Sequence, residues 1–444
     1  MNLENKKVVI VGFGKTGLAV ANFLLNRKVN VFITDKEATK EKIENLKKLN
    51  GKIEVEFGKH SSSFLKGTDL IVISPGVDER VLPEIVLEEK IPVVSEIELS
   101  YSFSPSQKII AITGTNGKTT TTLMAGNLLK FAYQPYVVCG NIGNPFISEI
   151  EKITKDTYII IEVSSFQLEK IRNFKPYIGV ILNIADDHFD RYANFNEYIR
   201  SKEKIFINKE ENDWAVLNGD DKNCTNTGKK IKGNKIFFGF SKNFDVYFKN
   251  NSIYYNNEKI VNFDKTNLIG KGNIYNTMAI VSIGKICNIK NEIIEESLVN
   301  FTPPSHRMEK VRQINGITFI NDSKATNPHA VENALECLPD GKVILLMGGL
   351  DKELPFKQMR NIIEKKVKLL VLFGKAKDKI ENELKIKKIP VRKFDNLEDA
   401  VDFSYKNSKK GDIVLLSPGC ASFDQFKNYE ERGNVYKRKV SNLL

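Results

Sequence analysis

The sequence predicts an α/β protein built from three domains, and three observations support this prediction. First, 444 residues are more than one hydrophobic core can organise, so two or three domains are expected. Second, short apolar runs typical of buried strands alternate with segments of helical spacing along the chain. Third, two of these runs end in glycine-rich loops that lead into helices, at residues 12–17 and 113–120.

The bulk composition is that of an ordinary folded protein, with 41% hydrophobic and 27% charged residues. The formal net charge of +12 indicates either nucleic acid or a polyanionic small molecule as a partner. Because the lysines are scattered, without a basic arm, we expect phosphorylated ligands and no nucleic acid. The five cysteines form no metal or redox spacing, which favours a cytoplasmic protein. The apolar runs are too short for a membrane span or a signal peptide.

Residues 1–97 are predicted to form a Rossmann-like domain, with strands at 7–11, 29–34 and 70–74. The first strand is followed by Gly-Phe-Gly-Lys-Thr-Gly at residues 12–17, a complete G-x-G-x-x-G, and Asp35 ends the next strand. Such glycines admit a pyrophosphate and such a carboxylate accepts a ribose hydroxyl, so the pattern indicates a nucleotide site. A tight turn without a ligand is the alternative.

Residues 98–302 are predicted to form a central parallel-sheet domain like that of P-loop ATPases. The apolar strand at 109–112 leads into Thr-Gly-Thr-Asn-Gly-Lys-Thr-Thr at residues 113–120. A helix is expected to start near Thr119, so the run has the strand, loop and helix that a phosphate-binding loop requires.

The residues of this loop have separable roles. Gly114 and Gly117 allow backbone N–H groups to turn toward a phosphate. Lys118 adds a full charge at the terminal phosphates, and Thr119 can offer its hydroxyl to Mg²⁺. Ile112 stands where the common pattern has its first glycine, so the loop is a shorter variant. A Gly/Thr-rich turn that only caps a helix is the alternative.

Two further apolar runs in the central segment, at 158–165 and 178–184, each end in polar residues. Ligands of open α/β sheets gather at such strand ends, so Glu162 is well placed to hold Mg²⁺ beside the phosphates. His188 follows the second run and is a second candidate ligand, with a surface or core position as the alternative. Residues 241–263 alternate around an Asn-Asn pair and predict a hairpin.

Residues 303–444 are predicted to form a third α/β domain, again Rossmann-like. It starts at a Pro-Pro pair, which cannot continue a helix. Strands are expected at 343–347, 369–373 and 413–417. Glycine-containing turns follow the first and last of these strands, where a site would lie.

A chain with both a G-x-G-x-x-G and an ATP-type loop is predicted to bind two different nucleotides. An NAD-dependent oxidoreductase would have no use for Lys118 and Thr119. A P-loop protein that hydrolyses ATP without forming a bond would not account for the third segment. An ATP-driven enzyme whose substrate is a nucleotide conjugate would need both loops.

The ordered runs of this sequence resemble the motifs of the Mur ligases, the ATP-dependent amide-forming enzymes of peptidoglycan precursor synthesis. The matching runs are residues 113–120, Glu-Val-Ser-Ser-Phe-Gln-Leu-Glu at 162–169, Asp-His-Phe-Asp-Arg at 187–191, Ser-His-Arg-Met at 305–308 and Asn-Asp-Ser-Lys-Ala-Thr-Asn at 321–327. The G-x-G-x-x-G, Ser-Pro-Gly-Val at 74–77 and the run at 417–427 resemble the members that add D-glutamate. The resemblance extends from Gly12 to about Tyr429.

The resemblance implies an ADP-forming acid–amino-acid ligase that joins D-glutamate to UDP-N-acetylmuramoyl-L-alanine through an acyl phosphate. It implies ATP and Mg²⁺, with a second metal ion held through a carbamylated Lys202. A carbamate converts an ammonium into an anion, which explains how a lysine could help to bind a cation. We expect a monomer whose partners are these small molecules.

The resemblance also assigns roles to individual residues. The catalytic set is Lys118, Glu162, His188 and Lys202, and the metal ligands are Thr119, Glu162, His188 and Lys202. ATP contacts fall on Gly114, Thr115, Asn116, Gly117, Lys118, Thr119, Thr120, Asn273, Arg307 and Asp322. Contacts with the UDP substrate fall on Gly14, Thr16, Asp35, Lys36, Asn141 and His188. D-Glutamate contacts fall on Lys324, Thr326, Lys352, Ser422 and Tyr429.

Two alternative functions are compatible with the motifs of the central segment: a sister ligase that adds another amino acid, and a folylpolyglutamate synthase. The G-x-G-x-x-G and the run at 417–427 argue against both. The choice between the amino acids is a question for a substrate assay.

Overall fold

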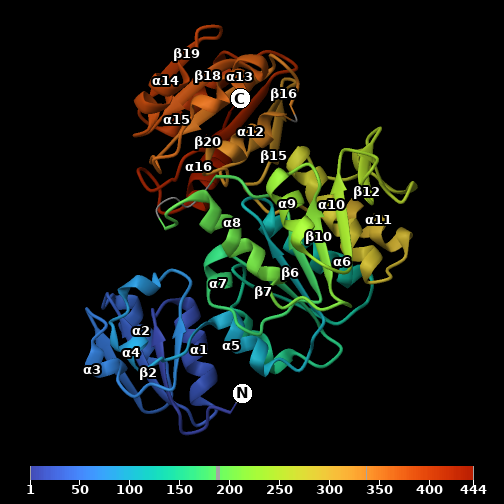
Figure 1. The fold of residues 1–444 in the computed structure, drawn as a ribbon. Coiled ribbons are helices and arrows are strands. Elements are labelled where there is room, and N and C mark those ends of the chain that lie inside the picture. Colours follow the sequence, from blue (N-terminus) through green and yellow to red (C-terminus); the bar gives the residue numbers. More distant parts are fainter. Residues whose placement is uncertain (1, 187–190, 337, 444) are drawn as a thin grey trace. The chain divides into compact units, whose positions relative to one another are not determined.

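The computed structural model describes residues 2–186, 191–336 and 338–443, and its strands form three sheets (Figure 1). Helices pack against each sheet, which confirms the predicted α/β class. His188 lies outside the described residues. Within them, no helix combines the length and the apolar character needed to cross a membrane.

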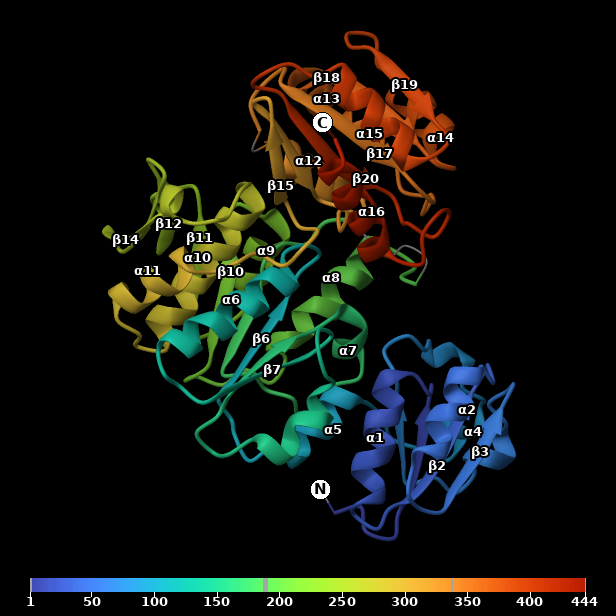
Figure 2. The same ribbon diagram turned by 180° about the vertical axis from the view of Figure 1, so that it is seen from behind.

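The first sheet has five parallel strands in the order β3-β2-β1-β4-β5. Its elements are β1 (Lys7–Val11), α1 (Lys15–Leu25), β2 (Asn30–Asp35), α2 (Lys40–Lys47), β3 (Ile53–Phe57), α3 (Ser62–Leu65), β4 (Leu70–Ile73), α4 (Ile85–Glu88) and β5 (Val93–Ser95). Alternate residues of β1 enter different cores: Val8 and Ile10 pack with α1, and Val9 and Val11 pack with α3 and α4. Helices therefore cover both faces, as the views in Figures 1 and 2 show. This strand order follows the doubly wound order 3-2-1-4-5-6 through its fifth strand.

The second sheet has nine strands in the order β14-β13-β12-β11-β10-β9-β6-β8-β7. The strands are β6 (Ile109–Thr113), β7 (Tyr136–Gly140), β8 (Tyr158–Glu162), β9 (Ile178–Ile181), β10 (Trp214–Asn218), β11 (Lys235–Gly239), β12 (Val246–Lys249), β13 (Ser252–Tyr255) and β14 (Glu258–Asn262). The helices are α5 (Glu96–Phe103), α6 (Lys118–Phe131), α7 (Ser165–Glu169), α8 (Phe195–Glu203), α9 (Lys222–Lys230), α10 (Lys271–Ile286) and α11 (Asn291–Val299). The strands from β7 to β12 in this order are parallel, so the carboxyl ends of β6, β8 and β9 meet at one edge.

The predicted hairpin is confirmed and is formed by β12 and β13, which pair antiparallel. Asn250 and Asn251 connect them with φ values of +48° and +52°. Two central residues with positive φ are typical of a type I′ turn, which matches the twist of the flanking strands and which asparagine tolerates. Tyr247 and Tyr254 stack across the pair with ring centroids 5.1 Å apart. The turn chemistry thus explains why the hairpin was visible in the sequence.

The third sheet has six strands in the order β15-β16-β20-β17-β18-β19, and only β15 among these pairs antiparallel. Its elements are β15 (Glu309–Ile314), β16 (Ile317–Asn321), α12 (Pro328–Glu336), β17 (Val343–Gly348), α13 (Arg360–Lys366), β18 (Val367–Phe373), α14 (Lys377–Leu384), β19 (Val391–Phe394), α15 (Leu397–Lys406), β20 (Ile413–Gly419) and α16 (Tyr429–Ser441). In β17, Leu345 and Met347 pack with α12, α13 and α14, whereas Ile344 and Leu346 pack with α15 and α16. Both faces are buried, so these strands read as continuous apolar runs.

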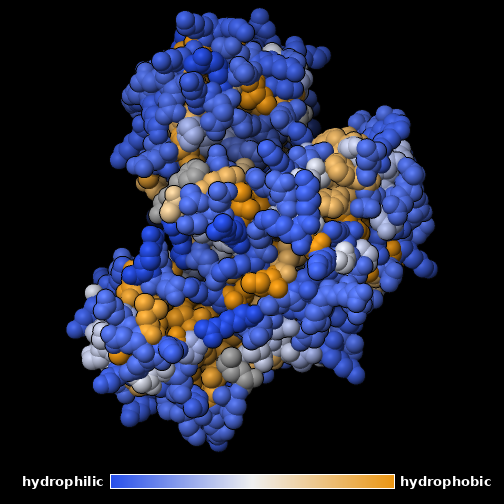
Figure 3. Space-filling model, viewed as in Figure 1, coloured by the Kyte–Doolittle hydropathy of each residue, from blue (hydrophilic) through white to orange (hydrophobic). Residues whose placement is uncertain are grey.

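The described residues divide into two compact units. The first two sheets belong to one unit, and the third sheet belongs to the other together with the segment Asn262–Thr277. On the face drawn in Figure 3, hydrophilic residues cover most of the surface and hydrophobic residues form separate patches.

Candidate functional site

The phosphate loop lies between β6 and α6, as the sequence predicts, with α6 starting at Lys118. Gly117, directly before the helix, has a φ of +88°, and Gly114 has a φ of +149°. Residues with a Cβ rarely adopt these values, so the path of the loop requires glycine at both positions. The first N–H groups of a helix have no partner within the helix and lie at its positive dipole end, so α6 presents an anion-binding terminus to the loop.

Asn183, two residues beyond β9, holds the loop in this shape. Its backbone carbonyl accepts a hydrogen bond from the N–H of Thr115 at 2.9 Å. Its side chain pairs with Asn116 in both directions: Oδ1 accepts from the Asn116 N–H at 2.8 Å, and Nδ2 donates to the Asn116 carbonyl at 3.0 Å. The sequence prediction did not single out Asn183. A polar residue just after a buried strand was the signal that could have found it.

Lys118 and Lys202 both donate to the carbonyl oxygen of Gly114. The Nζ of Lys118 lies 2.8 Å from this oxygen and 2.9 Å from the carbonyl oxygen of Thr115. The Nζ of Lys202 lies 3.0 Å from the same Gly114 oxygen. Lys202 comes from α8, is 1% exposed and lies over the Tyr198 ring. Two lysines that are 84 positions apart in sequence are thus brought together at the phosphate loop.

Glu162 ends β8 and pairs in register with Ile112, the penultimate residue of β6. Its Oε1 accepts a hydrogen bond from Nδ2 of Asn141 at 2.8 Å, and its backbone carbonyl accepts from the Asn141 N–H at 2.9 Å. Its Oε2 is buried and has no hydrogen-bond partner among the described residues. A buried carboxylate oxygen without a partner is costly unless another group binds it.

Only some of the residues predicted to bind metal are suitable ligands for Mg²⁺. Thr119, in the first turn of α6, and Glu162 supply the oxygen ligands that magnesium prefers. The open Oε2 of Glu162 is the observation that favours a cation here. Among residues 2–186, 191–336 and 338–443, no three His, Cys, Asp or Glu side chains gather as a metal site. A magnesium ion would therefore depend on the nucleotide phosphates and water for its remaining ligands.

A cavity of about 630 Å³ lies at the carboxyl ends of the first sheet. Five of the six residues predicted to contact the UDP substrate line it: Gly14, Thr16, Asp35, Lys36 and Asn141. The sixth, His188, is not described. The cavity is large enough for a nucleotide-sized ligand. Asn141 reaches it from the second sheet, and Lys15 of the glycine loop donates to the Gly143 carbonyl at 2.6 Å.

Asp35 holds the glycine loop rather than standing open in the cavity. Its Oδ2 accepts from the Phe13 N–H at 2.6 Å, and its Oδ1 accepts from the Glu37 N–H at 3.0 Å and from Lys42 Nζ at 2.7 Å. Burial opposes ionisation of Asp35, but these hydrogen bonds and the charge of Lys42 outweigh it and lower the pKa of the carboxyl group. The carboxylate therefore stays ionised and fixes the loop.

Two residues that the sequence prediction missed, Lys42 and His60, also line this cavity. Lys42 comes from α2, and His60 bonds through Nδ1 to the Thr34 hydroxyl at 2.8 Å. Burial and the neighbouring Lys36 lower the pKa of His60, so the imidazole is neutral near pH 7. Nothing in the local sequence marks either residue, because each belongs to the cavity only through the order of the strands.

The remaining residues predicted for ATP belong to the unit of the third sheet. Asn273 lies near the start of α10, and its Nδ2 donates to the Ile269 carbonyl at 2.7 Å. Asp322 follows β16 and accepts from the Ser417 hydroxyl at 2.8 Å and from the Met308 N–H at 3.2 Å. Burial raises the pKa of Asp322 to about 7, although these hydrogen bonds and the charge of Arg307 act in the opposite direction.

The five residues predicted for D-glutamate lie on segments of the third sheet that hydrogen bonds tie together. Lys324 places its Nζ 3.9 Å from the centre of the Tyr429 ring. Thr326 follows Ala325, whose carbonyl accepts from Gly419 at the end of β20. Leu350 and Ala421 exchange two backbone hydrogen bonds, which joins the segment of Lys352 to that of Ser422.

Arg432 of α16 lies at the centre of these segments and is completely buried. Its guanidinium donates to the carbonyl oxygens of Ser323, Cys420 and Ala421 at 2.7, 3.1 and 3.2 Å and to the Ser323 hydroxyl at 3.0 Å. Burial lowers the pKa of Arg432 to about 10. The sequence prediction missed it, although a cation on the apolar face of a helix, in step with Tyr436, was a visible signal.

Three family models match the chain. They are described as "Mur ligase MurD-like, N-terminal domain" over residues 6–95, "Mur ligase middle domain" over residues 112–284 and "Mur ligase, glutamate ligase domain" over residues 306–420. Together they cover all three sheets.

Curated relatives match over the full length. A protein of Caldicellulosiruptor bescii named UDP-N-acetylmuramoylalanine--D-glutamate ligase is 41% identical and covers 100% of this chain and 99% of its own. A protein of the same name from Clostridioides difficile is 37% identical, with both chains covered completely. Among solved structures, a MurF ligase of Thermotoga maritima in complex with ADP has a TM-score of 0.65 at 17% identity, covering 96% of this chain and 99% of its own. This likeness concerns the fold.

Proposed function

The chain belongs to the Mur ligase family, and from this premise we propose that it adds D-glutamate to UDP-N-acetylmuramoyl-L-alanine with ATP, in peptidoglycan precursor synthesis. The full-length similarity to relatives named for this activity supports the choice of substrates. The cavity beside the first glycine loop and the phosphate loop, to which we assign the two nucleotides, support the same reaction.

The chemistry requires activation because a carboxylate does not acylate an amine in water. The γ-phosphoryl group of ATP is transferred to the alanine carboxylate, which gives an acyl phosphate and ADP. The amino group of D-glutamate then attacks the acyl carbon, loses a proton, and expels inorganic phosphate from a tetrahedral intermediate. Positioned charges stabilise the phosphoryl transfer.

The observation that carries this proposal is the hydrogen bond between Asn141 and Glu162. Asn141 lines the cavity assigned to the UDP substrate, and Glu162 lies beside the phosphate loop, with one carboxylate oxygen that has no hydrogen-bond partner in the described part of the chain. One amide therefore connects the substrate cavity with the site where phosphoryl transfer would occur. An enzyme that phosphorylates the end of a nucleotide conjugate needs such a connection.

Lys118 is assigned to the β- and γ-phosphates. In the structure its Nζ is held by carbonyl oxygens of the loop itself, next to the helix terminus that would receive the phosphates. Thr119 and Glu162 would hold Mg²⁺, which supplies neutralisation of the phosphate charge when bound. Asn273 and Arg307 are assigned to adenine and phosphate, and Asp322 to the ribose.

Lys202 is assigned to a second metal ion in its carbamylated form. Its ammonium shares the Gly114 carbonyl with that of Lys118, so two positive charges lie close together, and the one on Lys202 is buried. Addition of CO₂ to the neutral amine, with loss of one proton, would give a carbamate anion and replace this repulsion by attraction. His188 is assigned to the same metal and to the substrate.

The D-glutamate site is assigned to Lys324, Thr326, Lys352, Ser422 and Tyr429. The two lysines can each neutralise one carboxylate of the amino acid as compact charges. We further assign residues 1–97, 98–302 and 303–444 to UDP-substrate, ATP and amino-acid binding. The protein is expected to act as a cytoplasmic monomer, which light scattering of the purified chain would test.

The deciding experiment measures phosphate release from ATP with each substrate omitted in turn. Phosphate should appear only when UDP-N-acetylmuramoyl-L-alanine and D-glutamate are both present, because the acyl phosphate forms on the first and is consumed by the second. Equal turnover with L-lysine, meso-diaminopimelate or L-alanine in place of D-glutamate would overturn the assignment. Phosphate release from ATP alone would favour an ATPase that forms no bond.

A further inference from the structure

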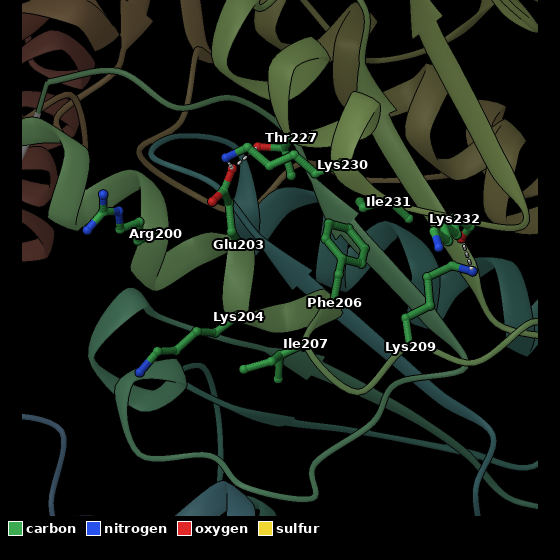
Figure 4. Close-up of a pocket in the computed structure, with 10 residues that line it drawn as sticks. All are labelled: Arg200, Glu203, Lys204, Phe206, Ile207, Lys209, Thr227, Lys230, Ile231 and Lys232. Carbon is green, nitrogen blue, oxygen red and sulfur yellow. Dashed lines mark hydrogen bonds and ion pairs between the residues drawn. The ribbon is translucent and has the colours of Figure 1, made fainter.

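A second cavity, of about 450 Å³, lies in the central domain away from the site described above (Figure 4). It is lined by the last turn of α8, the short helix at Lys204–Phe206, the segment that follows it, and Thr227, Lys230, Ile231 and Lys232 at and after the end of α9. None of its lining residues belongs to the phosphate loop or to the UDP cavity. The proposed reaction leaves this cavity without a role.

Three apolar side chains form part of the lining: Phe206, Ile207 and Ile231. The Phe206 ring lies against Gly179 of β9. A Cβ at this position would approach the ring to 2.6 Å, so the glycine leaves the room that the ring needs. Figure 4 shows this ring in the middle of the labelled side chains. Ile207 is 64% exposed and belongs to the lining. The apolar part of a ligand could therefore pack against the Phe206 ring and the exposed Ile207 side chain.

Basic residues dominate the rest of the lining. Of the ten lining residues that the structure describes, five are basic, at positions 200, 204, 209, 230 and 232, and only Glu203 is acidic. Glu203 is already engaged, because its Oε1 accepts from Lys230 Nζ at 2.6 Å and from the Thr227 hydroxyl at 2.9 Å. The cavity therefore carries an excess of positive charge that would attract an anion.

Two of these lysines bond to neutral oxygens. Lys204 donates to the Glu169 carbonyl at 2.7 Å, and Lys209 donates to the carbonyls of Glu210 and Lys232, each at 3.1 Å. Burial lowers the pKa of the Lys209 ammonium group; Asp213 acts against this shift and Lys235 adds to it. An anion beside Lys209 would favour its charged form.

We propose that this cavity is a binding site for a small amphipathic organic anion. Its aromatic or branched aliphatic body would rest on Phe206, Ile207 and Ile231. One anionic group, such as a carboxylate or a sulfonate, would lie among the lysines. The volume falls within the range of small-molecule sites, and the mixture of an apolar base with a few charged groups is typical of them. The ligand would contact the last turn of α8, the helix that carries Lys202.

The test uses a matched pair of fluorescent dyes on the full chain, with ATP and UDP present to fill the nucleotide sites. 8-Anilinonaphthalene-1-sulfonate has the apolar body and the anionic group, and N-phenyl-1-naphthylamine is its neutral counterpart. The sulfonate should bind about tenfold more tightly, since it adds the attraction of the lysines to the same apolar contact. Equal affinity of the two dyes would overturn the proposal and leave only an apolar patch.

Substitutions then locate the bound dye. Ile207→Ser and Lys230→Gln remove an apolar contact and a charge from the cavity, and both side chains are more than half exposed, so the fold should persist. Each should weaken sulfonate binding about tenfold. The controls are Leu87→Ser, at another exposed aliphatic residue, and Lys229→Gln, the neighbour of Lys230 that does not line the cavity. Binding that survives both cavity variants, or falls equally in the controls, would show that the dye binds elsewhere.

Discussion

The two glycine loops of this protein follow the same local plan, a buried strand, a glycine turn and a helix, yet side chains of opposite charge bind their backbones. In the loop after β1, the Phe13 N–H is occupied by a carboxylate, Asp35, at 2.6 Å. In the loop after β6, two ammonium groups, those of Lys118 and Lys202, converge on the Gly114 carbonyl. A carboxylate thus binds the backbone of the first loop, and two ammonium groups bind the backbone of the second.

This difference shows what the glycine pattern alone leaves open. Glycines determine where the backbone can pass, and both loops need them. The charge comes from residues at the ends of neighbouring elements: Asp35 ends β2, and Lys202 lies on α8. The second loop is therefore suited to a triphosphate, whereas the first offers its cations, Lys36 and Lys42, from the cavity wall. Each of the following predictions concerns a change that affects one of the two loops.

The largest effect is expected for Lys118→Ala, which removes a cation from the second loop. We expect kcat to fall about 10³-fold, or about 4 kcal/mol, because the charge stabilises the phosphoryl group during transfer. Phosphate release under saturating substrates measures it. Lys130→Ala, at the exposed end of the same helix, is the control and should keep wild-type turnover. Normal turnover of Lys118→Ala would mean that the loop is only structural.

Lys202→Ala tests the second cation. We expect a loss of about 10²-fold in kcat, since the residue would supply a metal-binding carbamate at the same loop. Short carboxylic acids such as acetate should restore part of the activity by replacing the carbamate. Arg200→Ala, an exposed change on the same helix, should have no effect and no response to acetate. A fully active Lys202→Ala enzyme would refute the assigned role.

Asp35→Asn tests the first loop, where the charge has the opposite sign. The amide keeps the shape of the carboxylate but weakens its hydrogen bonds with Phe13, Glu37 and Lys42. We expect KM for the UDP substrate to rise about tenfold with little change in kcat, because the change affects binding and not phosphoryl transfer. Glu37→Gln, an exposed carboxylate of the same cavity, is the control. A loss confined to kcat would contradict the separation of the two loops.

The smallest effect is expected for pH. Hydrogen bonds and Lys42 lower the pKa of Asp35 despite its burial, and burial lowers that of His60. A hydrogen bond from Arg80 lowers the pKa of Asp78 in the same cavity to about 2. These carboxylates stay ionised and the imidazole neutral between about pH 7 and pH 9, so affinity for UDP should be flat there. Calorimetric titration would check this, and a midpoint within that window would be inconsistent with the assignment.

The lowered pKa of Asp35 also determines how this residue affects the stability of the fold as the pH changes. A carboxyl group whose pKa is lower in the folded state stabilises the fold above its unfolded pKa, and this contribution is lost as the pH falls through the folded value. The contribution of Asp35 should therefore disappear only below about pH 4. Thermal unfolding of wild type and Asp35→Asn would converge in that acidic range.

The sequence predicted the interior strands of the sheets more readily than their edges. The strand from Lys7 to Val11 was predicted to the residue because it is buried on both faces and reads as a continuous apolar run. Ile53–Phe57, Glu309–Ile314 and Val391–Phe394 were not predicted. Each is an edge strand that carries charged residues on its open face, so no apolar run marks it.

The candidate site was predictable where local motifs carry it. The glycines of both loops, Lys118 and Glu162 follow from strand ends and spacing, and Lys202 required the resemblance to a family. Asn183, Lys42 and His60 reach their positions through the order of the strands, which no local pattern encodes. Tertiary hydrogen bonds therefore supply what sequence spacing could not.

The buried Arg432 has a consequence for how the third domain opens. Its guanidinium donates hydrogen bonds to the carbonyl oxygens of Ser323, Cys420 and Ala421. Ser323 lies about a hundred positions before the other two in the sequence. Breaking one of these contacts leaves a buried charge less solvated, so the segments should be released together rather than singly. Amide hydrogen exchange should therefore report a single opening event for residues 322–326 and 419–423, with one shared protection energy. The site proposed for D-glutamate would then behave as one cooperative unit, present or absent as a whole.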